Sequence, residues 1–236
     1  MRPNSLLILL GLTLSLSSYA QRQYRDDAEV RAHFGLETKF NKHWGMYLDQ
    51  QYRFGDNVSH LTRGSAKLGL TYKFNKHLKV LGDYRFLQRR KNAGYYVTRH
   101  WFSGAIAAKG DIGYWRFVYR GMIQMRNGDM NTDRQHLTRW YNRHKLSIRY
   151  EVSKRVTLYT SGELYIPLNN TSYSGIDRSR HHVGALFNTF KNQQLELYFM
   201  YEPQYHKGGW FGDTDKYPDP YLRRRFVFGI GYGISI

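Results

Sequence analysis

The stretch RGSAKLGLTYKF, residues 63–74, decides the fold because its side chains alternate between two chemical kinds. The even-numbered positions run Gly, Ala, Leu, Leu, Tyr and Phe, whereas the odd-numbered positions run Arg, Ser, Lys, Gly, Thr and Lys. Successive side chains of a β-strand point to opposite faces. The stretch therefore predicts a strand with one apolar face and one polar, basic face.

The same alternation recurs along the chain, and no part of it after the N-terminus shows a comparable helical stripe. Most of the segments are about ten residues or longer, the length that a tilted membrane strand needs, whereas soluble strands average about five or six. Eleven segments are predicted, namely 28–40, 44–54, 63–74, 78–89, 99–109, 114–126, 139–152, 156–166, 180–190, 194–205 and 221–236.

The connections between these segments alternate in length. Short turns, such as Asn41-Lys42-His43 and its repeat Asn75-Lys76-His77, alternate with longer polar loops, such as 127–138 and 206–220. This asymmetry favours an outer-membrane barrel over a soluble sandwich or lipocalin-like barrel, which would also alternate. We expect an all-β fold, an antiparallel transmembrane β-barrel of 10–12 strands with short periplasmic turns and longer extracellular loops.

Eleven is an odd number, whereas bacterial single-chain barrels normally have an even number of strands. Three arrangements would resolve this. Segment 28–40 could pair outside a ten-stranded wall, a twelfth strand could exist, or the first and last strands could close the barrel in parallel.

The N-terminus predicts export. A basic start, an apolar run from Leu6 to Leu16 and small residues before Gln21 are typical of a signal peptide over residues 1–20, which leaves residues 21–236 as the barrel.

The 236-residue chain has 36 Lys+Arg against 18 Asp+Glu, a formal charge of +18, which by itself suggests nucleic acid as a partner. Export to the outer membrane argues against that partner. The absence of cysteine excludes a disulfide scaffold and a thiolate metal site.

If the apolar face meets lipid, the charged face lines the lumen. Each later strand that follows a long loop begins with an inward arginine, so these arginines should form a basic ring at the outer mouth: Arg63, Arg99, Arg143, Arg180, Arg223 and Arg225. Neighbouring strands carry the acids that we expect as ion-pair partners: Asp49, Asp83, Glu163 and Glu196.

Basic rings select anions in pores, so the leading hypothesis is a narrow pore or binding site for a small anionic solute. The alternative is a closed structural or adhesive barrel whose loops bind a partner, since a barrel of this size can be filled by its own side chains. A lipid-modifying enzyme is less favoured, because His100, His144 and His181 should face outward while Ser103 and Ser147 should not. We expect no catalytic residues, no metal and no cofactor, and a monomer in contact with outer-membrane lipid and lipopolysaccharide.

Several motifs carry a family resemblance. They are Phe34-Gly35-Leu36-Glu37-Thr38-Lys39-Phe40-Asn41-Lys42-His43-Trp44, Gly69-Leu70-Thr71-Tyr72-Lys73-Phe74-Asn75-Lys76-His77, and the pair Tyr52-Arg53-Phe54 and Tyr84-Arg85-Phe86. With them the chain resembles an uncharacterised Gram-negative barrel family known only as domain of unknown function two-four-nine-zero. The resemblance implies an outer-membrane β-barrel and supplies no catalytic residues.

Overall fold

The computed structural model describes residues 24–91, 93–127, 138–169, 174–205 and 222–236. The expected signal peptide, residues 1–20, lies outside these residues. In the described part no helix is long and apolar enough to cross a membrane. The strands are β1 (Tyr24–Lys39), β2 (Trp44–Gly55), β3 (His60–Lys73), β4 (Leu78–Arg90), β5 (Tyr96–Ile112), β6 (Trp115–Arg126), β7 (Arg139–Glu151), β8 (Val156–Pro167), β9 (Arg178–Phe190), β10 (Gln193–Pro203) and β11 (Leu222–Ser235).

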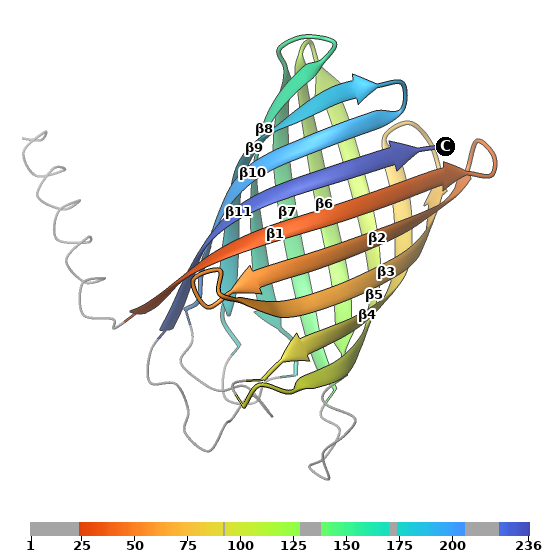
Figure 1. The fold of residues 1–236 in the computed structure, drawn as a ribbon. Helices are drawn as coiled ribbons and strands as arrows, with labels where there is room; N and C mark the ends of the chain where they lie inside the picture. The colour runs from red at the N-terminus through yellow and green to blue at the C-terminus, as the bar shows by residue number, and fades with distance from the viewer. Residues whose placement is uncertain (1–23, 92, 128–137, 170–173, 206–221) are drawn as a thin grey trace, which may run out of the picture.

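The strands form one closed barrel in which every strand pairs with its neighbours in sequence. The closing pair, β1 and β11, is parallel, from Tyr24 opposite Leu222 to Glu37 opposite Ser235. Figure 1 shows these two strands side by side, with their arrows pointing the same way. Directions cannot alternate all round a ring with an odd number of members, so one parallel pair is unavoidable. The all-β barrel is thus confirmed, and parallel closure is the arrangement that the chain adopts.

Asparagine and histidine build the repeated Asn-Lys-His turns. The Asn41 Oδ1 atom accepts hydrogen bonds from the backbone N–H groups of His43 and Trp44, both at 2.8 Å, and Asn75 does the same in the next such turn. The His43 Nδ1 atom lies 2.8 Å from the backbone oxygen of Lys73, so the ring ties one hairpin to the next. The repeat is therefore a structural device for reversing the chain.

Two connections at the opposite end are shorter than expected. Residues 56–59 join β2 to β3, and residues 91–95 join β4 to β5. Asp56, Asn57 and Val58 have φ angles of 54°, 54° and 67°, in the left-handed region that reverses a chain within a few residues. The three later connections at this end are longer, in keeping with the expected asymmetry.

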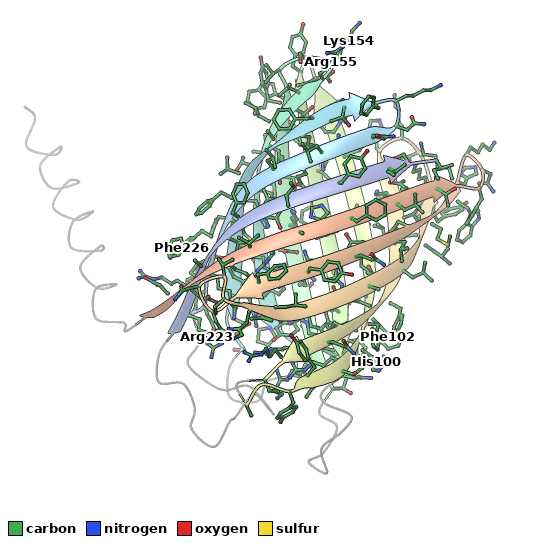
Figure 2. All side chains as sticks on the ribbon, viewed as in Figure 1. His100, Phe102, Lys154, Arg155, Arg223 and Phe226 are labelled. Atoms are coloured by element: carbon green, nitrogen blue, oxygen red, sulfur yellow. The ribbon has the colours of Figure 1, made fainter. Side chains whose placement is uncertain are left out.

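The outer face of the wall is apolar. Leu68 and Leu70 are each 50% exposed, whereas Thr71, whose side chain points inward, is 4% exposed. Figure 2 labels Phe102 and Phe226, two further outward side chains. Exposed apolar side chains over the whole wall suit contact with lipid rather than water.

Aromatic rings gather on the outer face at the short-turn end. The ring centroids of Trp44 and Tyr72 are 4.9 Å apart, and those of Tyr72 and Phe74 are 5.0 Å apart. Such clusters are typical of the aromatic girdle that marks a membrane interface.

Candidate anion-binding site in the barrel lumen

The six expected mouth arginines lie on the inner face, in the half of the barrel that carries the longer loops. Figure 2 shows this end at Arg223, and the opposite, short-turn end at Lys154 and Arg155. Strand register aligns some of the six with acids, since Arg180 lies opposite Glu163 and Arg225 lies opposite Glu202. The six are Arg63, Arg99, Arg143, Arg180, Arg223 and Arg225.

Glu163 on β8 is bound by three cations. Its Oε1 atom lies 2.6 Å from Arg143 Nη2 and 3.3 Å from Arg120 Nη2, and its Oε2 atom lies 3.7 Å from Arg180 Nη1. The carboxylate is 3% exposed. A carboxylate so far removed from water is stable only when it is paired and hydrogen-bonded, so these arginines hold the wall together here.

Two further carboxylates extend this pairing around the barrel. Glu202 on β10 accepts hydrogen bonds from Arg180 and Arg225. Arg225 Nε also lies 3.9 Å from Glu29 Oε2, and Glu29 accepts a hydrogen bond from Arg31. We call the set of Glu29, Glu163 and Glu202 with Arg31, Arg120, Arg143, Arg180 and Arg225 the carboxylate network; it runs from β6 through β11 to β1.

The other acids expected as partners lie deeper in the lumen, away from the mouth arginines. Asp49 Oδ1 is 3.5 Å from Arg85 Nη2 and 3.9 Å from Lys67 Nζ. Asp83 accepts a hydrogen bond of 2.9 Å from the Tyr47 hydroxyl. Glu196 Oε2 lies 3.1 Å from His33 Nε2, and Glu196 also accepts a hydrogen bond from Tyr159.

Sequence reasoning did not single out Glu29 or Glu202 as partners. The alternation places both on the inner face, but it does not align strands that are far apart in the chain. Glu29 reaches Arg225 only because β1 pairs with β11 in the parallel seam.

From β1 to β4, next to the carboxylate network, arginines face one another. Arg31, Arg53, Arg63 and Arg89 are directly opposed partners on β1, β2, β3 and β4, and we call them the arginine row. The Arg53 guanidinium donates from Nε and Nη2 to the neutral Gln51 Oε1, at 3.0 and 2.7 Å. In the described residues, neither Arg53 nor Arg63 has a carboxylate oxygen within 4.0 Å. Directly opposed like charges repel, so Arg53 and Arg63, the two inner members of this row, are short of negative charge.

Trp101 on β5 lies among three guanidinium groups. The guanidinium carbons of Arg126, Arg63 and Arg85 are 4.5, 5.6 and 6.0 Å from its ring centroid. Of these three arginines, only Arg85 has a carboxylate oxygen within 4.0 Å in the described part of the chain, at Asp49. The Trp101 Nε1 and Arg63 Nε atoms are buried and meet no hydrogen-bond acceptor within the described part of the chain. We call Trp101, Arg63 and Arg126 the indole cluster.

Several large inward side chains near the indole cluster are buried. Leu87 and Tyr165 are 0% exposed, and Tyr141 is 1% exposed. The Tyr165 ring is 4.4 Å from the Arg143 guanidinium carbon and 4.7 Å from that of Arg180. The Tyr165 ring on β8 therefore packs between guanidinium groups from the neighbouring strands β7 and β9.

Closer to the short turns, aromatic side chains lie flat against the wall. A Cβ on Gly69 would lie 2.4 Å from Tyr47 Cζ, because the ring crosses β3 to reach Asp83 on β4. A Cβ on Gly231 would lie 2.1 Å from the His33 ring, which crosses β11 in the same way. Only glycine allows this approach.

Solvent reaches inward charges at this deeper level. Arg120 is 32% exposed, Glu196 is 26% exposed and Asp49 is 24% exposed. Inward charges nearer the short turns are therefore partly accessible to solvent.

On the outer face, the structure pairs a serine with a histidine that sequence reasoning overlooked. Ser179 Oγ lies 2.8 Å from His181 Nε2 and 2.7 Å from the Tyr205 hydroxyl. The two-residue spacing of Ser179 and His181 on one strand was the available signal. Ser179 is 2% exposed, and no carboxylate in the described residues hydrogen-bonds His181.

The other two outward histidines are bound by tyrosines. The Tyr84 hydroxyl is 2.6 Å from His100 Nδ1, and the Tyr119 hydroxyl is 2.7 Å from His144 Nδ1. Among the described residues, no group of three or more potential ligands is placed to hold a metal ion.

Three solved barrel structures are similar to this chain in fold. The NanC porin superposes with a TM-score of 0.51 at 12% identity, covering 88% of this chain and 99% of that one. The translocator domain of autotransporter NalP from Neisseria meningitidis gives 0.44 at 9% identity, covering 70% of each chain. The beta domain of the Bordetella autotransporter BrkA gives 0.47 at 13% identity, covering 80% of this chain and 82% of that one. At these identities the likeness establishes the fold alone.

No curated protein matches the chain in sequence. One family model does, over residues 32–213, which include most of the barrel wall. The chain therefore belongs to the family described as protein of unknown function (DUF2490), as its hairpin motifs indicated.

Proposed function

We propose that this chain is an outer-membrane protein whose lumen binds a small anionic solute and gives it a narrow passage. The observation that carries the proposal is the uneven distribution of carboxylates. Three buried carboxylates pair with the arginines of the carboxylate network, whereas Arg53, Arg63 and Arg126 have no carboxylate oxygen within 4.0 Å in the described residues.

The physical reason is the cost of burying like charges together. Arginine does not lose its proton in proteins, so the arginine row cannot relieve its repulsion by deprotonation. A mobile anion would supply the missing charge and accept hydrogen bonds from the guanidinium groups. This arrangement favours an anion over a neutral or cationic solute.

The size of the barrel makes the route narrow. Wide aqueous channels need about 16–18 strands, and this wall has eleven. Small solutes would therefore move past the arginines one at a time, in contact with side chains, rather than through a water-filled pore.

Planar-bilayer recordings of the purified protein test the proposal. We expect small conductance steps and a reversal potential in a KCl gradient that reports anion preference. The double substitution Arg53→Gln and Arg63→Gln should reduce that preference. Arg116→Gln is the matched control, because Arg116 is 47% exposed at the short-turn end and pairs with Asp111. Preference for cations would overturn the proposal.

A second candidate is a closed structural or adhesive barrel whose outer loops bind a partner. The fully buried Leu87 and Tyr165 side chains favour it, since they fill the lumen at the mouth. If folded protein gives no conductance in planar bilayers at any voltage, that result would favour this candidate over the first.

We propose that the apolar outer face contacts outer-membrane lipid and that Arg90, the last residue of β4, and Lys91, which follows it, contact lipopolysaccharide phosphates. The barrel closes on itself through β1 and β11, so it offers no sheet edge for pairing with a second copy. We propose a monomer, to be checked by light scattering in detergent, with no cofactor, nucleic-acid partner or enzymatic activity.

A further inference from the structure

We propose that the indole cluster is a binding site for one oxyanion group: a carboxylate, phosphate or sulfate that accepts hydrogen bonds from Trp101 Nε1–H and Arg63 Nε–H. This inference rests on the proposed function and specifies where in the lumen the anion binds. Nothing in the arginine ring expected from the sequence pointed to Trp101 or Arg126.

The first argument is hydrogen-bond satisfaction. Trp101 is 8% exposed, and its Nε1 atom can only donate. Arg63 Nε can also only donate, and both atoms are buried with no acceptor among the described residues. Buried polar groups in proteins are nearly always hydrogen-bonded, so two acceptor-less donors on β3 and β5 point to an absent acceptor.

The second argument is charge. Arg63 and Arg126 both lie over the Trp101 ring, at 5.6 and 4.5 Å from its centroid, and neither has a carboxylate partner among the residues that the structure describes. Arg85, the third guanidinium at this ring, is already paired with Asp49. Two uncompensated positive charges remain at the cluster, which suits a group of charge −1 or −2.

The third argument is that the cluster is held in place. Arg126 Nε donates to Gln124 Oε1 at 2.8 Å, and Gln124 Nε2 donates to Ser103 Oγ at 3.1 Å. The Arg126 guanidinium also lies 4.1 Å from the Tyr141 ring centroid. These contacts fix the guanidinium before any ligand arrives, which lowers the entropy cost of binding.

The chemistry of the donors defines the ligand class. A planar guanidinium and an indole N–H together match two oxygens of a carboxylate, phosphate or sulfate. A spherical halide could meet only part of this geometry. The oxyanion could be a free inorganic ion or a group on a larger organic solute, and both share this chemistry.

Anion titrations of the purified, folded barrel in detergent test the site. Sulfate, inorganic phosphate and acetate are added at constant ionic strength against chloride, and binding is followed by calorimetry and tryptophan fluorescence. We expect the oxyanions to bind more tightly than chloride. Acetate binding as tightly as phosphate would assign the site to carboxylated organic solutes. Phosphate or sulfate binding more tightly than acetate would assign it to phosphate or sulfate groups. Both results support the site.

The decisive variants remove single donors. Trp101→Phe keeps an aromatic ring but lacks the N–H group, and Arg63→Lys keeps the charge but lacks the planar donor. Each should weaken oxyanion binding about tenfold, the usual effect of losing one hydrogen bond to a charged group. Trp115→Phe and Arg116→Gln are the matched controls, because both residues are exposed at the short-turn end, and they should bind as the wild type does.

Migration of unboiled samples in gels confirms that each variant is folded. Unchanged oxyanion affinity in folded Trp101→Phe and Arg63→Lys would overturn the site while leaving the proposed function intact, provided that the wild type still prefers anions in bilayers. A wild type that binds no oxyanion and prefers cations would overturn both.

Discussion

Glu202 on β10 lies opposite Arg225 on β11 and accepts hydrogen bonds both from that guanidinium and from Arg180 on β9. The carboxylate is 2% exposed, so it bridges three neighbouring strands with almost no help from water. Glu202 lies at the centre of the carboxylate network, and its charge has a clear structural role in the lumen.

Glu202→Gln should destabilise the barrel. The substitution leaves two buried guanidinium groups without their negative partner, and breaking a buried pair in this way costs roughly 3 kcal/mol. Urea titration of the protein folded into lipid vesicles measures the loss. Glu151→Gln, at an exposed position at the short-turn end, is the control and should unfold at the wild-type urea concentration. Equal midpoints for both variants would contradict the structural role of Glu202.

Arg63→Gln should have the opposite effect at low salt. Arg63 lies opposite both Arg53 and Arg89, so removing its charge relieves repulsion in the arginine row, by up to about 1 kcal/mol. Thermal unfolding in low-salt buffer, compared with that of Arg116→Gln, measures this. A large loss of stability in Arg63→Gln would mean that the row is not repulsive.

Sulfate should stabilise the wild type more than it stabilises Arg63→Gln. A ligand that binds only the folded state at 100 times its Kd adds about 2.7 kcal/mol. Thermal unfolding is measured across a sulfate series, with chloride matched for ionic strength. It gives, for each protein, the slope of the melting temperature against sulfate concentration. Parallel slopes for the two proteins would show that sulfate acts on the whole surface rather than at the indole cluster.

The parallel seam can be tested by cross-linking, since the chain has no cysteine of its own. Ala32 lies opposite Ile230, so the double variant Ala32→Cys and Ile230→Cys should form a disulfide on mild oxidation. Ala32→Cys with Phe226→Cys is the control, because Phe226 lies four residues away along β11 and should not react. Efficient cross-linking of the control alone would show a different register.

Ser179 should be unreactive as a nucleophile. It is buried and its histidine partner has no carboxylate among the described residues, so the serine is not activated. A fluorophosphonate probe should label the wild type no more than it labels Ser179→Ala. Labelling that disappears only in Ser179→Ala would establish an enzyme instead.

Alternation along single strands determined much of this protein. It placed Lys67 and Arg63 inside and Leu68 and Leu70 outside, because the two-residue period is set by local backbone geometry. The Asn-Lys-His turns and the length of the segments then predicted an outer-membrane barrel, and the same motifs predicted the family.

Register across the barrel was decided only by the tertiary structure. Whether Arg225 meets Glu29, or Arg63 meets Arg53, depends on how strands slide past one another and on the parallel closure of β1 with β11. The alternation of side chains carries no information on the register between strands, because shifting a strand by any even number of residues leaves the same side chains on the inner face. The sequence therefore determined which charges point into the lumen, and the closed barrel alone decided which of them meet a carboxylate and which lie beside Trp101 without one.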